Sequence, residues 1–424
     1  MLRDERTCGP PATEQGRPHP RRGAMDVHIV RQPIFDIHTR LFAYELLLCQ
    51  SPGMRPDGPS GDRTATGLLS TAFLTEGIEI IAGNKPCFIR FTANLLIKDL
   101  AASFPKHTII IEIPGNVPPS PEVLAACRSL SRQGFILALA DFVYARELLP
   151  LIELANIVKI DCQLADAATI ERTRDRLSRC NLKFLAEKVE THEELARVRT
   201  QGFNYVQGAF FARPESLRLT ELPSNKLHLL RLLAEVNRPE VSVDRLEHIV
   251  AADVAITYKL LRYVNSAFFS LLRQVASVRQ AIVYLGEREL RRFVTLVILS
   301  ELAADKPAEL VRLSAVRGRF CELLGRECGR EDTAELFFLG LFSLIDALLD
   351  APMAQLMDKL PLGAGIKEAL VHRQGPLVPF LDAAIAYEQG RTEACLHALA
   401  RLRIHAGTIY ALYLDAITFA QFLD

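Results

Sequence analysis

Charged and amide side chains recur at the carboxyl ends of apolar segments in the first half of this 424-residue sequence. Most of them are acidic, and like charges gathered in one place repel unless a cation, a lysine or a ligand compensates. Such a set would suit divalent metal ions and phosphate groups. A single Asp or Glu at such a position is more often the cap of a following helix. The interpretation as a metal and phosphate site therefore depends on the whole set and not on any one residue. It comprises Glu45, Arg90, Glu112, Asp141, Lys159, Asp161, Glu187, Glu190 and Gln207.

The polar residues of this set lie at the ends of short apolar segments between Val27 and Phe211, which are the elements expected to position them. Segments such as TIIIEI and FILALADF have the composition of buried strands, and amphipathic stretches such as SPEVLAACRSLSRQ lie between them. Repeated β-α units predict a parallel sheet, and about eight strands favour a TIM-like β/α barrel over the alternative, an open doubly wound sheet. Because barrel enzymes carry their chemistry at the carboxyl ends of the strands, a barrel would bring the set to one mouth.

The strand pattern stops near residues 215–226, where two proline-containing polar stretches lie, and the remaining sequence has helical periodicity. We therefore predict an α/β fold followed by an all-α fold. The predicted parts are a disordered tail over residues 1–25, a barrel domain over 26–222 and a helical domain with C-terminal helices over 223–424. We expect the two domains to fold separately but to touch. The segment AELVRLSAVRGRFCELLGREC is amphipathic, which favours a packing helix over a partner-binding face.

Composition excludes several classes of protein. With 50 basic and 50 acidic residues the formal net charge is zero, so no overall field attracts nucleic acid or an anionic membrane. Nine cysteines are scattered without a CxxC pair, which favours reduced thiols in a cytoplasmic protein. No apolar run reaches the roughly 18 to 20 residues of a membrane span, and the N-terminal segment lacks the apolar core of a signal peptide. We expect no membrane span and no clear nucleic-acid site.

The motifs RQPIFD, YELLL, FIRFT, IEIPG, ADF, VKID, AEKVE and VQGAFFARP, in this order, resemble the EAL family of bacterial cyclic di-GMP phosphodiesterases. In that family two Mg²⁺ or Mn²⁺ ions activate a water that opens one phosphodiester of cyclic di-GMP. The resemblance implies metal-ligand positions for Glu45, Glu112 and Asp141, and a general base or water-positioning role for Glu187. The further positions that match as candidates for ligand binding are Gln32, Lys159, Asp161 and Gln207.

Several positions depart from the family's pattern, and most of them concern metal. Ala140 replaces the first aspartate of the DDFG motif, and Arg90 replaces a metal-coordinating asparagine with a guanidinium. Losing several ligands together should remove most of the metal affinity. The other departures are Cys49 for an arginine that helps to hold phosphate, Gly115 for a glutamate, and Val143 and Lys188 for glycines.

The segments VAADVAITYKLLRYVNSAFFS and VASVRQAIVYLGERELRRFV resemble the HDOD family, over about residues 225–410. A His-Asp dipeptide is absent from the sequence, and the histidines of the helical segments are isolated, so no phosphohydrolase metal site is expected there. The resemblance implies a helical module that contacts a protein partner.

Together these features predict a bacterial signalling adaptor rather than an enzyme. Its EAL domain would be catalytically degenerate, with a vestigial Glu187 and no metal or other cofactor, and Arg90, Lys159 and Gln207 would hold cyclic di-GMP without metal. Its HDOD domain would bind a protein partner. The alternative is a cyclic di-GMP phosphodiesterase that depends on Mg²⁺ or Mn²⁺ and retains residual activity.

Overall fold

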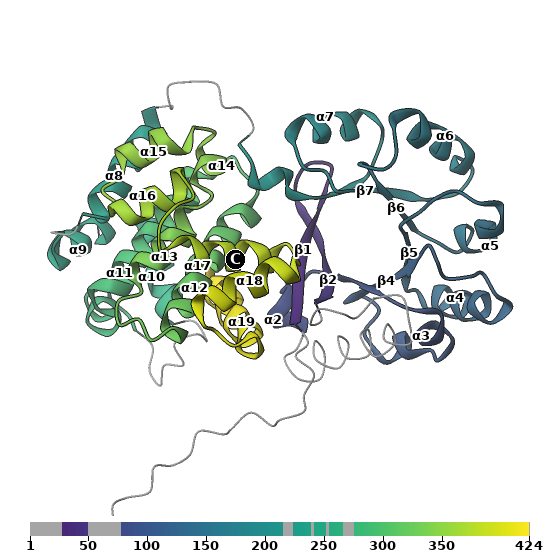
Figure 1. Cartoon of the computed structure of the whole chain (residues 1–424), viewed down its shortest axis with the longest axis horizontal. Coiled ribbons are helices and arrows are strands. Elements are labelled where there is room, and N and C mark those ends of the chain that lie inside the picture. Colours follow the sequence, from purple (N-terminus) through teal and green to yellow (C-terminus); the bar gives the residue numbers. More distant parts are fainter. Residues whose placement is uncertain are drawn as a thin grey trace, which may run out of the picture.

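The structure, a computed structural model, describes residues 28–49, 78–214, 224–238, 241–251, 254–265 and 275–423. Its two halves lie side by side, the strand-containing half in purple to teal and the helical half in teal-green to yellow (Figure 1). The predicted tail over residues 1–25 and the predicted boundary at residues 222 and 223 lie outside the described residues.

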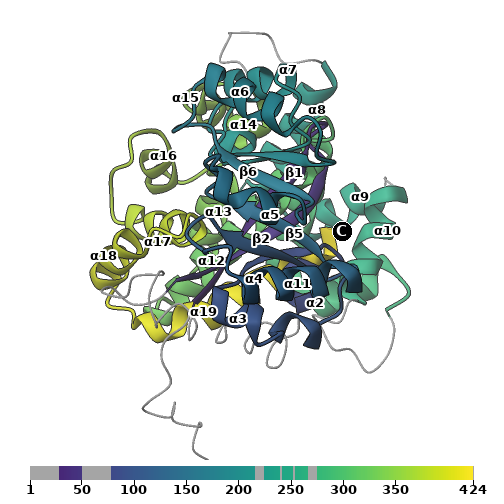
Figure 2. The ribbon, with the colours of Figure 1, turned by 90° about the vertical axis from the view of Figure 1, so that its right-hand side faces the viewer.

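Eight strands close into a barrel in sequence order, which confirms the predicted TIM-like barrel and excludes the open sheet. Strands β2 to β8 are parallel to their neighbours, whereas β1 is antiparallel to both β2 and β8. Figure 2 looks onto the barrel, with the helical half behind it. The strands are β1 (His28–Asp36), β2 (Leu41–Cys49), β3 (Cys87–Arg90), β4 (Ile109–Pro114), β5 (Ile136–Ala140), β6 (Ile157–Asp161), β7 (Lys183–Glu187) and β8 (Tyr205–Gln207).

Helices follow the later strands, as the β-α pattern predicts. Their caps are Ser120, Asp166 and Thr191, whose side-chain oxygens accept backbone N–H groups in the first turns of α4, α6 and α7. None of the three belongs to the set of polar residues at the strand ends, so these three helix caps do not account for that set. The helices of this half are α2 (Ile78–Ala82), α3 (Ala93–Ile97), α4 (Pro121–Gln133), α5 (Leu149–Ile152), α6 (Ala167–Leu177) and α7 (His192–Thr200).

The interior of the barrel has two layers of side chains. One buried apolar layer contains a residue from each strand: Ile34, Ala43, Phe88, Ile110, Ala138, Ile157, Leu185 and Tyr205. Because side chains alternate along a strand, the residues two positions nearer the mouth also point inward. They form what we call the polar layer, in which Ala140 is the one apolar member: Gln32, Glu45, Arg90, Glu112, Ala140, Lys159, Glu187 and Gln207.

The second half is helical, as predicted, and α12 lies at its centre, with most of its residues buried. Helix α13 approaches α12 closely at Gly340, where an added Cβ would lie 2.4 Å from the carbonyl oxygen of Arg317. The helices are α8 (Ser224–Val236), α9 (Val243–Ala251), α10 (Val254–Val264), α11 (Val278–Leu302), α12 (Ala308–Glu327), α13 (Ala334–Phe342), α14 (Ile345–Leu349), α15 (Met353–Lys359), α16 (Ala364–Val371), α17 (Val378–Glu388), α18 (Thr392–Leu402) and α19 (Ile409–Ala420).

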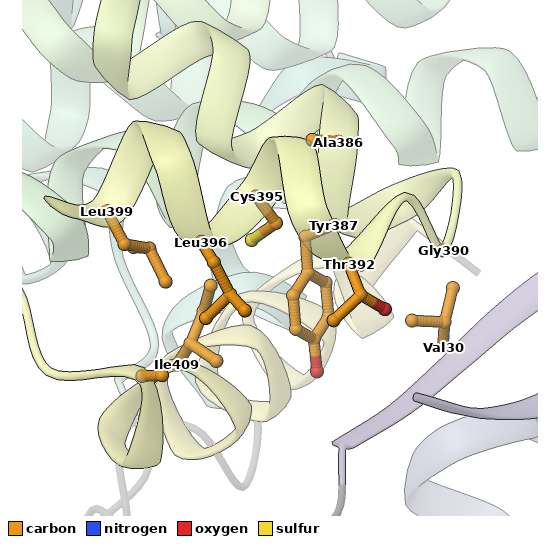
Figure 3. A pocket seen from close by; sticks show the side chains of 10 residues that line it. Val30, Ala386, Tyr387, Gly390, Thr392, Cys395, Leu396, Leu399 and Ile409 are labelled. Carbon is orange, nitrogen blue, oxygen red and sulfur yellow. The ribbon is translucent and has the colours of Figure 1, made fainter. Parts of the chain in front are cut away.

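The halves touch, as predicted, along the first strands of the barrel. Helices α17 and α19 pack against β1, and α19 also packs against α2. The Tyr387 hydroxyl donates to the carbonyl oxygen of Ile29 at 3.3 Å. An almost wholly apolar pocket lies beside this contact, between Val30 and residues of α17, α18 and α19 (Figure 3). Among the described residues, no helix combines the length and apolar character that crossing a bilayer requires.

Candidate active site

Lys159 lies at the centre of the polar layer and is fully buried. Its Nζ lies 2.8 Å from Glu112 Oε2, 2.8 Å from Glu187 Oε1 and 3.2 Å from Glu45 Oε2. The ring of Phe88, one layer below, lies 5.6 Å from the same nitrogen. Three acids from three separate strands therefore converge on one point, as the barrel prediction requires.

Arg90, at the end of β3, is a second cation among the acids. Its Nη2 lies 3.0 Å from Glu112 Oε1 and 3.3 Å from Asp141 Oδ2. Glu112 thus binds Lys159 with one oxygen and Arg90 with the other. The Arg90 side chain is 41% exposed and that of Lys159 is 0% exposed, so only Arg90 can turn into solvent without crossing the core.

Gln207 connects two further members of the layer. Its Nε2 donates to Glu45 Oε2 at 2.6 Å and to Gln32 Oε1 at 3.2 Å. Its Oε1 is buried and accepts no hydrogen bond. A buried acceptor without a donor costs about 1 to 3 kcal/mol, so a ligand N–H or O–H would be stabilised here.

Two residues at the strand ends adopt left-handed backbone conformations that residues with a Cβ rarely take. They are Asp141, with φ of 49°, and Lys188, with φ of 57°. The conformation of Lys188 explains why the motif it resembles has glycine there. Gly115 packs against the backbone of Asp141, because an added Cβ would lie 2.8 Å from the Asp141 carbonyl oxygen. Such backbone strain is concentrated at functional sites.

Asp161 and Glu190 lie outside the group around Lys159. One Asp161 oxygen accepts the backbone N–H groups of Gln163 and Leu164, and the other lies 2.6 Å from Lys188 Nζ. Asp161 therefore caps its own loop, as a strand-end acid often does. Glu190 instead pairs with Arg213 at 3.2 Å.

The structure brings together eight of the nine candidate ligand-binding residues through direct contacts, all but Asp161. Sequence reasoning missed the contact of Phe88 with Lys159. The signal was present, because Phe88 lies two residues before Arg90 on the same strand and therefore faces the same side.

The electrostatics of the group follow from its burial. Burial disfavours the charged form of Lys159, but Glu112, Glu45 and Glu187 outweigh it and raise the lysine pKa. Burial also disfavours the Glu112 carboxylate, but Lys159 and Arg90 together lower its pKa below the ordinary value. For Glu187 burial is the largest effect, and burial, helped by Glu45 and opposed by Lys159, raises its pKa to about 7.

Carboxylate oxygens are the ligands that Mg²⁺ and Mn²⁺ prefer. Among the described residues, no three acidic, histidine or cysteine side chains form an open metal site. Lys159 and Arg90 already hold the acidic oxygens. One nitrogen of Arg90 lies between Glu112 and Asp141, where a metal ion could be coordinated. A divalent ion at this point would take the place of the Arg90 guanidinium between Glu112 and Asp141.

The fold and site define a β/α barrel with an acidic mouth, joined to a helical half. The EAL domain family matches residues 87–214, and the HDOD domain family matches residues 222–357. The chain is similar to a Vibrio cholerae protein named cyclic di-GMP phosphodiesterase CdgJ, with 36% identity over 87% of each chain. It is also 32% identical to the uncharacterized protein YuxH of Bacillus subtilis, over 88% of this chain and 93% of that protein.

Among solved structures, the barrel is similar to Klebsiella pneumoniae BlrP1 in a complex with manganese and cyclic di-GMP. The TM-score is 0.37 at 19% identity, over 44% of this chain and 55% of that chain. From the two domain matches and the two relatives, this chain belongs to the family of proteins in which an EAL domain is followed by an HDOD domain.

The expectation that the protein is not an enzyme is wrong. The relative that overturns it is the Vibrio protein, which is named a phosphodiesterase and is similar over both halves of the chain. The expectation rests on the joint loss of ligands at Ala140 and Arg90. The structure nevertheless keeps Glu45, Glu112 and Glu187 on one centre, with Asp141 beside them.

Proposed function

We propose that this protein is a metal-dependent phosphodiesterase that hydrolyses cyclic di-GMP to a linear dinucleotide. The observation that carries the proposal is the convergence of four acidic side chains at one barrel mouth, in a chain similar throughout to a named cyclic di-GMP phosphodiesterase. The reaction adds water across one P–O bond and leaves one phosphate monoester and one sugar hydroxyl.

Glu187 is the proposed general base. Its side chain is 14% exposed, so one oxygen can reach a water at the mouth while the other stays on Lys159. A base works best when its pKa lies near the working pH, and the Glu187 pKa of about 7 meets this condition. Lys159 then holds the carboxylate in a fixed orientation.

The phosphates of the substrate need cationic partners at the mouth. Arg90 and Lys188 are both about half exposed and both lie on acidic partners there. A guanidinium that leaves Asp141 can bind two phosphate oxygens at once. We assign the phosphate contacts to Arg90 and Lys188, and a contact with a substrate N–H or O–H to the unpaired Oε1 of Gln207.

Glu45, Glu112 and Asp141 would hold the Mg²⁺ or Mn²⁺ ion. When bound, this ion supplies a water of lowered pKa and stabilises the charge that develops on the phosphate. Arg90 would then have two roles: its guanidinium occupies the place of the ion between Glu112 and Asp141, and away from these acids it would bind the phosphate.

The helical half is proposed to contact a protein partner and the whole protein to act in the cytoplasm, as the HDOD resemblance and the scattered cysteines imply. Neither proposal bears on the chemistry of the barrel.

Hydrolysis of cyclic di-GMP by the full-length protein tests the proposed function. We expect a linear dinucleotide in the presence of Mn²⁺, no product after chelation by EDTA, and loss of activity in Glu45→Ala. A wild-type protein that binds Mn²⁺ and cyclic di-GMP but forms no product would refute the proposal.

A further inference from the structure

Within the described residues, the β1–β2 hairpin contains no helix between its two strands. The strands are joined directly by the turn over residues 37–40, whereas β-α units cover later strands. Helices of the other half pack there instead. Tyr44 on β2 is fully buried by this packing, so part of the outer wall of the barrel is supplied by the helical half.

Tyr44 is held on three sides. Its hydroxyl donates to Glu309 Oε2 at 2.8 Å, in the first turn of α12. Arg312 Nη1, one turn later, donates to the same hydroxyl at 3.2 Å. The Arg31 guanidinium from β1 lies 4.7 Å above the Tyr44 ring and donates to the carbonyl oxygen of Ile81 at 2.6 Å.

These contacts keep Tyr44 in a single position. The hydroxyl and the Glu309 carboxylate are both buried, and leaving either unpaired would be costly. Burial, with the nearby Glu309 charge, raises the pKa of Tyr44, so the hydroxyl keeps the proton that it donates.

Tyr44 is adjacent in sequence to Glu45, which points the opposite way, into the barrel. Successive side chains of a strand face opposite sides, about 3.3 Å apart along the chain. Tyr44 pairs with Pro33 and Cys87, and its N–H donates to the carbonyl oxygen of Pro86 at 3.0 Å. A shift of the Tyr44 side chain therefore moves the same short backbone segment that carries Glu45.

We propose that Tyr44 and Glu309 form a positioning pair, through which the first turn of α12 fixes Glu45 against Lys159 and Gln207. This inference rests on the proposed function, in which Glu45 is a metal ligand. Because a displacement of about 1 Å in a catalytic group can cost about 100-fold in rate, a contact outside the barrel can control the site inside it. The helical half then contributes to catalysis without touching the substrate.

The test uses the full-length protein and the variants Tyr44→Phe, Glu309→Leu and the double variant. Tyr44→Phe keeps the ring under Arg31 and removes only the hydroxyl. Glu309→Gln is the conservative variant, because its amide oxygen can still accept from Tyr44. Tyr387→Phe is the matched control. It also removes a hydroxyl from the contact between the halves, but Tyr387 lies on α17 and donates to Ile29 of β1, away from Glu45.

Three quantities are measured: turnover of cyclic di-GMP, Mn²⁺ binding from the loss of the free-ion EPR signal, and the thermal midpoint. We expect Tyr44→Phe to lower kcat and to weaken Mn²⁺ binding, each about tenfold, with little change in KM. Glu309→Gln should stay near wild type. The double variant should be no worse than the more severe single variant, because both remove one interaction.

Equal effects of Tyr44→Phe and Tyr387→Phe on Mn²⁺ binding would overturn the inference, as would additive effects in the double variant. The wild type separates the two proposals. If it turns over cyclic di-GMP and the variants match it, the positioning pair is wrong and the function stands. If it binds Mn²⁺ in a Tyr44-dependent way without turnover, the function is wrong and the pair stands, and a wild type that does neither refutes both.

Discussion

Each half of the molecule contains a buried group in which several charges surround one opposite charge, and the two groups have opposite composition. In the barrel one lysine, Lys159, is surrounded by three glutamates. In the helical half one glutamate, Glu322, accepts from Arg292, Arg319 and Arg326 at 2.6 to 3.1 Å, and Arg288 lies 3.6 Å away. In the proposed function the acidic group exchanges a cation for a metal ion, whereas the basic group offers one carboxylate and has no such role.

The groups also differ in how the chain assembles them. Arg319 and Arg326 lie three residues before and four residues after Glu322 on the same helix. Helical spacing alone brings these together. The acids around Lys159 come from separate strands, and only the closed barrel joins them. A local group can stabilise helices wherever it occurs, but an active site needs the positions that long-range topology fixes.

The largest effect should come from removing the proposed base. Glu187→Gln keeps the shape and a hydrogen bond with Lys159 but cannot take a proton, so turnover should fall about 10²- to 10⁴-fold. Glu190→Gln, three residues further along the chain and paired with Arg213 instead, is the matched control and should keep most activity. Steady-state kinetics with cyclic di-GMP measure both, and equal losses would show that Glu187 has no special role.

The basic group should matter for stability and little for chemistry. Glu322→Gln removes the buried carboxylate that Arg292 shares with Arg319 and leaves Arg292 with the partly exposed Glu289, so the free energy of unfolding should fall by about 3 kcal/mol. Asp415→Asn, which removes the half-exposed partner of Arg319, should cost less than about 1 kcal/mol. Denaturant titration measures both variants. A Glu322→Gln protein as stable as wild type would show that the basic group does not stabilise the helical half.

A smaller effect is expected from the competing cation in the barrel. Arg90→Asn removes the guanidinium from Glu112 and Asp141, so the Mn²⁺ concentration for half-maximal activity should fall about tenfold. The KM for cyclic di-GMP should rise in the same variant, because a phosphate contact is lost. Arg40→Asn, in the turn at the far end of the β1–β2 hairpin, should change neither value. Unchanged Mn²⁺ dependence in Arg90→Asn would mean that the guanidinium does not occupy the metal position.

The smallest effect is a pH dependence of a few fold around neutrality. The Glu187 pKa of about 7 lies above its ordinary value, so kcat should rise with pH and level off above about 8, once the carboxylate is ionised. For stability the sign is opposite. The folded protein keeps a proton that the unfolded chain releases, so this contribution is full below pH 4.5 and is lost as pH rises through about 7. A rate that falls between pH 6 and 8 would contradict the assignment of the base.

The sequence predicted the barrel, the helical half and most of the polar layer, because alternation in strands and periodicity in helices are local signals. It did not predict that Lys159 is the centre of the site, since that depends on which strands face one another across the barrel. The prediction that the protein is not an enzyme was wrong. Comparing Ala140 and Arg90 with a motif shows that ligands are missing, but this comparison cannot show that Glu112 and Asp141 share one cation.

The cover that the helical half gives to the β1–β2 hairpin limits how this protein can be divided or recombined. A barrel separated from its helices would expose Val30 and Tyr44, which lie against residues of the helical half and are now fully buried. Domains joined only by a linker can be exchanged between genes without loss of stability. In this protein the helical half covers strands β1 and β2 of the barrel, so the two halves depend on each other. Replacing one half with that of a distant relative would require matching changes at Glu309 and Tyr44, so evolution is expected to change the two halves together rather than one at a time.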